Sequence, residues 1–288
     1  MDLDTLLHET SHVPATEIRT WTPPAEGHRR FLTPVRLTAA AAGAAAVLVI
    51  PAISLHSGST PTASAAAAEV LHRAAVAAGA QPDGGWQDAK YWYSKSTYSR
   101  DGHTFTREIW IGHHDQGFLK DAGVDDRVMP LGMPALFDNG GHWDSLWSLP
   151  TDPDQLTSLF RSQIHKAGSG PDPDSELFTW VGDYLRETPA PPKLRAALYE
   201  VAARVPGVEL VGPTTDSAGR PGIGITRGGE LLIIDPQDGA LLADDGGSGF
   251  TATYLDQHPV ETAPTPSSDF VVQSDGGVLD TRVGGHKP

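Results

Sequence analysis

The densest group of potential metal ligands in the sequence is the run His113-His114-Asp115. Two imidazoles and a carboxylate are donor types that bind zinc and related divalent ions. The run directly follows a segment with strand character, 103–112, and adjacent strand residues point to opposite faces of a sheet. Because the two imidazoles then cannot share one ion, we interpret the run as the exposed end of a strand. We expect no metal ligands and no cofactor.

Two acidic pairs, Asp152 with Asp154 and Asp172 with Asp174, have the composition of a calcium loop but not its pattern. A proline lies inside each pair, and neither pair is followed by the loop glycine and terminal glutamate of an EF-hand. Aspartate followed by proline is typical of a helix start, where the carboxylate accepts hydrogen bonds from backbone N–H groups. We therefore interpret both pairs as helix caps.

Other residues that could support chemistry show no characteristic spacing. The chain has no Gly-x-Ser-x-Gly elbow and no phosphate-binding glycine loop, and the glycine-rich stretch 246–249 reads as a turn. We interpret Trp143 and Trp147 as core residues, because large aromatic side chains usually provide buried area. A carboxylate pair that meets only in the folded chain, as in glycoside hydrolases, stays open. The histidines without ligand spacing are His142, His165 and His258.

Composition excludes several kinds of partner and anchor. The formal net charge is −15, and residues 37–288 hold 31 acidic and 17 basic side chains, a net charge of −14. Because an acidic surface repels phosphate backbones, we expect no nucleic-acid binding. The chain has no cysteine, which excludes disulfides, thiolate catalysis, cysteine-based zinc sites and a lipid-modified cysteine anchor.

The segment 37–55, LTAAAAGAAAVLVIPAISL, is predicted to be a transmembrane helix. It carries no charge, and nineteen helical residues extend about 28 Å, close to the roughly 30 Å of a hydrocarbon core. Basic residues precede it at Arg29, Arg30 and Arg36, and none follows until Arg73. The positive-inside rule then places residues 1–36 in the cytoplasm and the C-terminal part outside the cell membrane.

A cleaved signal peptide is the competing interpretation of this region. The run 29–32, RRFL, is similar to a twin-arginine signal, and 63–65, ASA, resembles a cleavage site. We favour a retained single-pass signal anchor, because 28 residues before the arginines are too many for such a signal. The cytoplasmic segment 1–36 is short and has no cysteine, so we expect it to lack the zinc-containing fold of many anti-sigma proteins.

After a flexible spacer at 56–63, the sequence predicts one extracytoplasmic α+β domain over 64–288. A helix is expected over 64–78. Two alternating segments, 90–100 and 103–112, flank Asp101-Gly102 and predict a β-hairpin. We assign its buried face to Tyr91, Tyr93, Phe105, Ile109 and Ile111. A third strand is expected at 117–121, followed by a loop over 122–141.

The rest of the domain is predicted as three amphipathic helices and then a second group of strands. The helices begin at Pro153, Pro173 and Pro192, with apolar residues on one side. The strands are expected at 208–211, 222–226, 230–235, 240–243, 250–255 and 277–282, with 230–235 covered on both faces. The predicted fold is a twisted antiparallel sheet with about three helices packed on one face.

Four segments carry a resemblance to a known family: 146–156, LWSLPTDPDQL; 185–210, LRETPAPPKLRAALYEVAARVPGVEL; 218–226, AGRPGIGIT; and 231–242, LLIIDPQDGALL. Together with the alanine-rich span and the YWY strand, they resemble an uncharacterised family of actinobacterial single-span membrane proteins. Several members are encoded beside extracytoplasmic-function sigma factors, which implies a role in envelope-linked regulation. The chain departs from the family pattern in its longer tail after Tyr254.

These observations lead to three functional hypotheses. The first is a non-enzymatic, membrane-anchored sensor or regulator that acts through envelope or regulatory protein partners. The second is an extracytoplasmic domain that binds a lipid or small ligand on the helix-covered side of the sheet; by analogy, such a sheet is similar to the lipoprotein-carrier and periplasmic sigma-regulator folds. An enzyme is the third. An open apolar pocket favours the second hypothesis, and a closed core with a surface patch favours the first.

Overall fold

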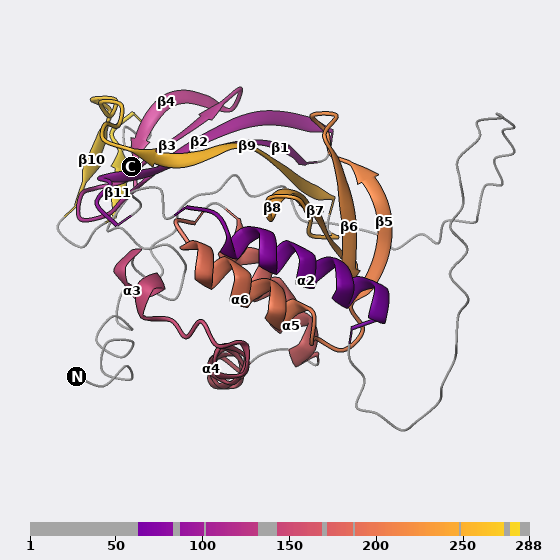
Figure 1. Ribbon diagram of the computed structural model, residues 1–288. Helices are drawn as coiled ribbons and strands as arrows, with labels where there is room; N and C mark the ends of the chain where they lie inside the picture. The colour runs from indigo at the N-terminus through magenta and orange to yellow at the C-terminus, as the bar shows by residue number, and fades with distance from the viewer. Residues whose placement is uncertain are drawn as a thin grey trace, which may run out of the picture. The chain divides into compact units, whose positions relative to one another are not determined.

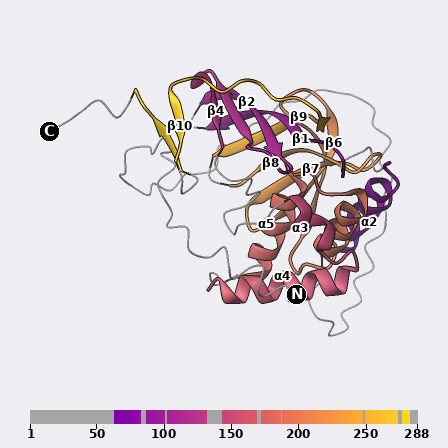
Figure 2. The ribbon, with the colours of Figure 1, turned by 90° about the vertical axis from the view of Figure 1, so that its left-hand side faces the viewer.

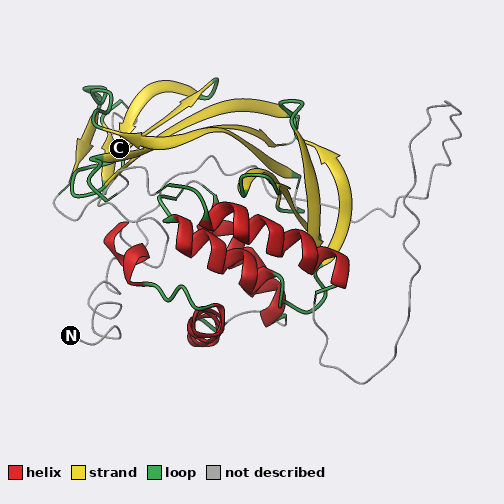
Figure 3. Cartoon of the chain, viewed as in Figure 1, coloured by secondary structure: helices red, strands yellow, loops and turns green. Residues whose placement is uncertain are grey.

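A nine-stranded, fully antiparallel sheet forms the centre of the domain (Figures 1 and 3). The computed structural model describes residues 63–82, 87–100, 102–131, 143–168, 172–186, 188–247, 249–273 and 277–282. In spatial order the strands are β4-β3-β2-β1-β9-β8-β7-β6-β5. Their bounds are β1 Tyr91–Arg100, β2 His103–Gly112, β3 Phe118–Ala122, β4 Asp125–Pro130, β5 Glu209–Thr215, β6 Pro221–Arg227, β7 Glu230–Asp235, β8 Ala240–Asp245 and β9 Phe250–Val260.

The sheet consists of two meanders that meet in the middle. Strands β1 to β4 are joined in one series of consecutive hairpins, and strands β5 to β9 in another. The two groups join where β9 pairs with β1, with Tyr91 opposite Val260 and Arg100 opposite Phe250. A bulge between Lys95 and Ser96 shifts the register of this pair. One continuous sheet therefore results from segments that lie far apart in the sequence.

The helices lie against the concave side of this curved sheet (Figure 1). α2 and α6 lie side by side, and α4 contacts α5 and α6 on the side away from the strands (Figures 1 and 2). The prediction of an α+β domain with a large antiparallel sheet is confirmed, but α4 packs on other helices instead of on the sheet. The helix bounds are α2 Ala65–Gly79, α3 Trp143–Ser148, α4 Pro153–Lys166, α5 Pro173–Leu185 and α6 Pro192–Ala202.

The predicted helix caps are present. The carboxylate of Asp152 accepts hydrogen bonds from the backbone N–H groups of Asp154 and Gln155, and Asp172 accepts the corresponding bonds at the start of α5. The hydroxyl of Ser64 caps α2 in the same way. Because capping depends on neighbours within one turn, local sequence determines where these helices begin.

One buried cluster joins the helices to the sheet. Leu198 of α6, Leu232 and Ile234 of β7 belong to it, and each is fully buried. Ile233, between them, points to the other face and is buried in a smaller cluster with Leu242. The expectation that this strand is covered on both faces is therefore confirmed.

The predicted buried face of the first hairpin is wrong for its tyrosines. Tyr93 lies opposite Trp110, whereas Ile111 lies opposite Trp92, so the tyrosines occupy the face opposite to the isoleucines. Trp92, Ser94, Ser96 and Tyr98 form the buried face of β1. The reason is the two-residue turn, which sets every odd-numbered residue of β1 opposite an even-numbered residue of β2.

Two further expectations fail around the ends of the sheet. Part of the expected loop 122–141 forms β4, and the segment 143–148, for which no element was predicted, forms the short helix α3. The segment at 277–282 does not complete the main sheet. Its strand β11 Val278–Asp280 pairs with β10 Phe270–Val272 in a separate two-stranded sheet. Arg127 of β4 holds this hairpin through Asp280, at 2.6 Å.

No helix among the described residues is long and apolar enough to cross a membrane. The segments predicted as the cytoplasmic part, the span and most of the spacer, 1–36, 37–55 and 56–62, lie outside the described residues. Their predicted roles stay predictions.

Candidate functional site

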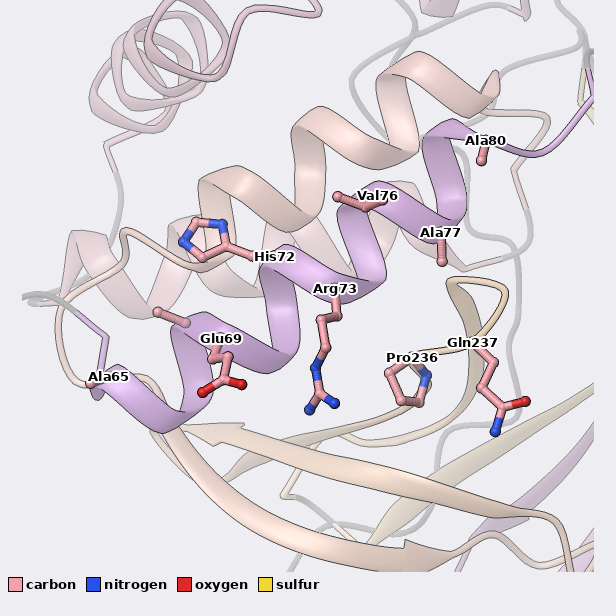
Figure 4. A pocket seen from close by; sticks show the side chains of 10 residues that line it. Ala65, Glu69, His72, Arg73, Val76, Ala77, Ala80, Pro236 and Gln237 are labelled. Carbon is pink, nitrogen blue, oxygen red and sulfur yellow. The ribbon is translucent and has the colours of Figure 1, made fainter. Parts of the chain in front are cut away.

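The outward face of α2 forms one wall of an open surface groove of about 810 Å³. Figure 4 shows how the side chains lie, with the turn between β7 and β8 forming the other wall. The lining is mostly apolar, and Val76 is the exposed apolar side chain along it, at 75% exposure. The ten lining residues are Ala65, Ala68, Glu69, His72, Arg73, Val76, Ala77, Ala80, Pro236 and Gln237.

The opposite face of α2 fixes the helix firmly against the domain. Val70, Leu71 and Ala74 of that face are buried in the core. Gly239, in the turn between β7 and β8, lies very close to α2: a β-carbon added to Gly239 would lie 2.6 Å from the β-carbon of Ala78. The φ of Gly239, +75°, also favours glycine at this position. Because α2 is fixed in this way, its outward face is available to a partner without a change in the position of the helix.

Polar contacts also attach the two walls to the helices beneath them. His72 Nδ1 lies 2.8 Å from Glu200 Oε1 of α6. The amide of Gln81 donates to the carbonyl of Asp238 at 3.2 Å, and the hydroxyl of Tyr199 donates to the carbonyl of Gly239 at 3.0 Å. The groove is thus a preformed apolar surface with charged residues, Glu69 and Arg73, on one wall. Such a surface can accept an apolar side chain flanked by charges from a partner.

The sequence contained a weak signal for this groove. The apolar residues Val70, Leu71, Ala74 and Ala78 of α2 recur at helical spacing as a stripe and form its buried side. Val76 falls outside that stripe, and an apolar residue on the polar side of an amphipathic helix marks a candidate contact. The second wall could not be read from the sequence, because Pro236 lies about 160 residues further along the chain.

The space between the helices and the sheet is filled by side chains. Leu198, Leu232 and Ile234 all have 0% exposure. A second surface hollow, of about 330 Å³, lies at the start of α6 beside Lys193 and Thr151. The α2 groove lies at the surface between α2 and the β7–β8 turn, and no residue that lines either hollow belongs to a strand of the sheet. Under the second hypothesis, a lipid or small ligand was expected to bind on the helix-covered face of those strands.

A buried polar network joins the end of α5 to the sheet. Arg186 donates to Glu230 at 2.7 Å and to Asp244 at 3.0 Å, and it also pairs with Asp183. Tyr254 donates its hydroxyl to Asp244 at 2.6 Å. Burial alone would lower the pKa of Arg186, but the surrounding carboxylates, Asp244 foremost, raise it above its usual value. These carboxylates are bound to a permanent cation, so the network is a structural clamp and does not form a general acid–base pair.

The interpretation of His113 and His114 as side chains on opposite faces is wrong. β2 ends at Gly112, so both histidines lie beyond the strand, and their rings stack with centroids 4.0 Å apart. His113 Nε2 lies 2.6 Å from Asp144 Oδ1 of α3. The sequence could not indicate this partner, because Asp144 is 31 residues away.

The other singled-out residues are dispersed. Trp143 is 1% exposed, which confirms its assignment to the core, and Trp147 packs half-buried against the same small cluster. His165 lies in the last turn of α4, and His258 pairs with Asp256 at 3.0 Å on β9. His142 lies outside the described residues, and Gly246 and Gly247 lie between β8 and β9.

No protein-family model matches the chain, and no curated protein matches it. The chain is similar to solved structures of MucB. It is 16% identical to a chain in the complex of Pseudomonas aeruginosa MucA and MucB, with a TM-score of 0.27, and the match covers 71% of this chain and 60% of that one. To a chain in a crystal structure of MucB it is also 16% identical, with a TM-score of 0.28, and the match covers 72% of this chain and 62% of that one. The chain thus spans about three fifths of the length of these structures.

Proposed function

We propose that this protein is a membrane-anchored, non-enzymatic regulator whose extracytoplasmic domain binds a partner protein through the α2 groove. The segment 37–55 is the anchor, and residues 1–36 are cytoplasmic. The family resemblance supports a link to an extracytoplasmic-function sigma factor.

The single observation that carries the proposal is the exposed apolar wall of α2 on an otherwise filled domain. Val76 is 75% exposed, whereas the opposite face of the helix is buried in the core. Exposed apolar surface bordered by charged residues is typical of protein contact sites. The acidic net charge outside the membrane disfavours nucleic acid as the partner.

The position of α2 in the chain narrows the class of partner. Nine residues, 56–64, separate the proposed anchor from the first residue of α2. A fully extended chain of that length reaches about 30 Å. The linker therefore limits the distance from the end of the proposed anchor to α2 to about 30 Å, which favours a partner segment that is itself membrane-anchored or lies at the membrane.

The two alternatives have less support. A lipid or small-ligand binder needs an open apolar interior, and the described interior is occupied by Leu198, Leu232 and Ile234. An enzyme needs functional groups free to react, whereas Glu230 and Asp244 are both committed to Arg186. Organic extraction of the purified protein tests the first alternative, and a tightly bound lipid in the extract would favour it over the regulator.

A pair of matched variants tests the groove. Val76→Glu adds a charge to the α2 wall, and Val124→Glu adds the same charge at a comparably exposed valine, 65% exposed, in the turn between β3 and β4. Tagged full-length protein is cross-linked in membranes, and co-purified proteins are identified by mass spectrometry. An envelope protein or sigma-linked regulator should be retained by Val124→Glu and lost with Val76→Glu. Equal recovery with both variants would show that the groove is not the contact surface.

A further inference from the structure

Two histidines and one aspartate from separate elements converge beside α3. One nitrogen from each of His113 and His114 and one carboxylate oxygen of Asp144 all lie within 4.8 Å of one another. The histidines lie in the connection from β2 to β3, and Asp144 is in the first turn of α3. His113 also stacks on the buried ring of Trp143, with centroids 4.7 Å apart. The position of the His113 ring is thus fixed by its packing on Trp143.

The hydrogen-bond partners of His113 are those of a metal-binding histidine. Its Nδ1 lies 3.3 Å from the carbonyl oxygen of Ala89, and its Nε2 lies 2.6 Å from Asp144 Oδ1. Both ring nitrogens therefore face acceptors. At 2.6 Å, Nε2 and Oδ1 form a direct hydrogen bond. A cation would replace the proton between them once the two atoms move apart, with the remaining ring proton on Nδ1. In metal sites, a ligating histidine usually donates its other N–H to a carbonyl or carboxylate, as Nδ1 can here.

We propose that His113, His114 and Asp144 bind a divalent transition-metal ion of the zinc class. Imidazole and carboxylate ligands suit this class, and three protein ligands leave the fourth tetrahedral position for water or a partner's side chain. Zinc bonds of about 2.0 to 2.2 Å place ligand atoms about 3.3 Å apart. Side-chain rotation of His114 and Asp144, both exposed, adjusts the present separations to that value.

The ion would join two parts of the domain between which the described residues form no backbone hydrogen bond. It links the β2–β3 connection to α3, the helix that carries Trp143 and Leu146 into buried clusters. An ion that binds the folded state and not the unfolded chain stabilises the fold by mass action. The site is separate from the α2 groove, since none of its three residues lines that groove.

Zinc titration of the full-length protein tests the site. The protein is purified in detergent, stripped with a chelator and titrated with Zn²⁺ in a calorimeter. We expect one equivalent to bind at this site, and His114→Phe to weaken that binding by at least about tenfold. Phenylalanine keeps a ring to stack on His113 but has no ligand nitrogen, so lost binding cannot be attributed to lost packing. Asp144→Asn should weaken binding in the same direction, and Zn²⁺ should raise the unfolding temperature of the unmodified protein but not of His114→Phe.

Two controls locate the bound ion. His258→Phe removes a histidine that also lies beside a carboxylate, Asp256, but has no second imidazole, and it should leave zinc binding unchanged. Replacement of His8 and His12 by alanine tests the N-terminal segment and should also leave it unchanged. The absence of zinc uptake, or equal affinity in His114→Phe, would show that His113 and Asp144 form an ion pair only. Loss of binding with the His8 and His12 replacement would place the zinc elsewhere and overturn the proposal.

Discussion

The guanidinium of Arg186 binds the carboxylate of Asp244, with Nε 3.0 Å from Oδ2, and so attaches the end of α5 to the concave face of β8. Asp244 has a side chain that is 4% exposed, and Glu230, the second carboxylate on Arg186, has one that is 10% exposed. Without the arginine, two buried carboxylates would have no cation beside them. We therefore expect the stability of the domain to depend on this contact.

We expect Arg186→Met to lower the free energy of unfolding by about 3 to 5 kcal/mol, because removal of one partner leaves buried charge without compensation. Denaturant unfolding monitored by tryptophan fluorescence measures the change. Arg161→Met is the control: Arg161 also binds an aspartate of α5, Asp174, but its side chain is 41% exposed. An exposed pair contributes about 0 to 1 kcal/mol. Equal losses in the two variants would contradict the role assigned to Arg186.

The core prediction concerns α6. Leu198→Ala should cost about 2 to 5 kcal/mol, a large part of a typical domain stability of about 5 to 15 kcal/mol, because it leaves a cavity beside the buried strand β7. Lys193→Ala, on the exposed side of the same helix, should change stability by less than about 0.5 kcal/mol. Denaturant melts of the full-length protein in detergent compare the two. Similar midpoints for both would mean that α6 does not pack as described.

The third prediction is that the stability of the C-terminal hairpin, β10 and β11, depends on pH. Hydrogen bonding to Arg127 lowers the pKa of Asp280 to about 2. Since the folded state favours the carboxylate, the attachment is fully present above the usual aspartate pKa, about 3.9, and is lost as the pH falls toward 2. The amide protection factors of β10 and β11, which are the observed exchange rates corrected for the intrinsic rate at each pH, should therefore fall below pH 4.

The control for this titration is Arg127→Met. In that variant the NMR-detected pKa of the Asp280 carboxyl should return toward about 3.9. A pKa that stays near 2 without the arginine would show that another group holds the carboxylate.

The topology prediction depends on Arg29, Arg30 and Arg36 on one side of an uncharged segment. Alkaline phosphatase, which is active only outside the cytoplasm, should be active when fused to the C-terminus, and a cytoplasmic reporter at the same position should not. Reversal of both results would contradict the proposed orientation. Recovery of a soluble chain that begins near Ala66 would instead identify the span as a cleaved signal.

Features that depend on near neighbours were predicted correctly from the sequence. Asp152 and Asp172 cap their helices, and β1 pairs with β2 as a hairpin with Arg100 opposite His103. The two-residue turn also contained the information that the face assignment of Tyr91 and Tyr93 overlooked. Once the turn length is known, odd positions of the first strand must oppose even positions of the second.

The expectations that failed involve choices between competing packing partners. The segment 277–282 has strand character, but the sequence does not say which edge it joins, and it pairs with β10. No element was predicted for the segment 143–148, which has no complete helix signal; it forms α3, with Trp143 and Leu146 in buried clusters. Tertiary packing of this kind overrides weak local preference.

By itself, the sequence determined the helix starts, the first hairpin, the α+β class and the acidic, cysteine-free character of the domain, because each follows from composition or from contacts within a few residues. The tertiary structure decided which distant side chains meet. Arg186 reaches Asp244 across 58 residues, and His113 reaches Asp144 across 31. Both contacts form where a helix packs against another part of the fold, α5 against β8 and α3 against the β2–β3 connection, and no local pattern records which parts will meet.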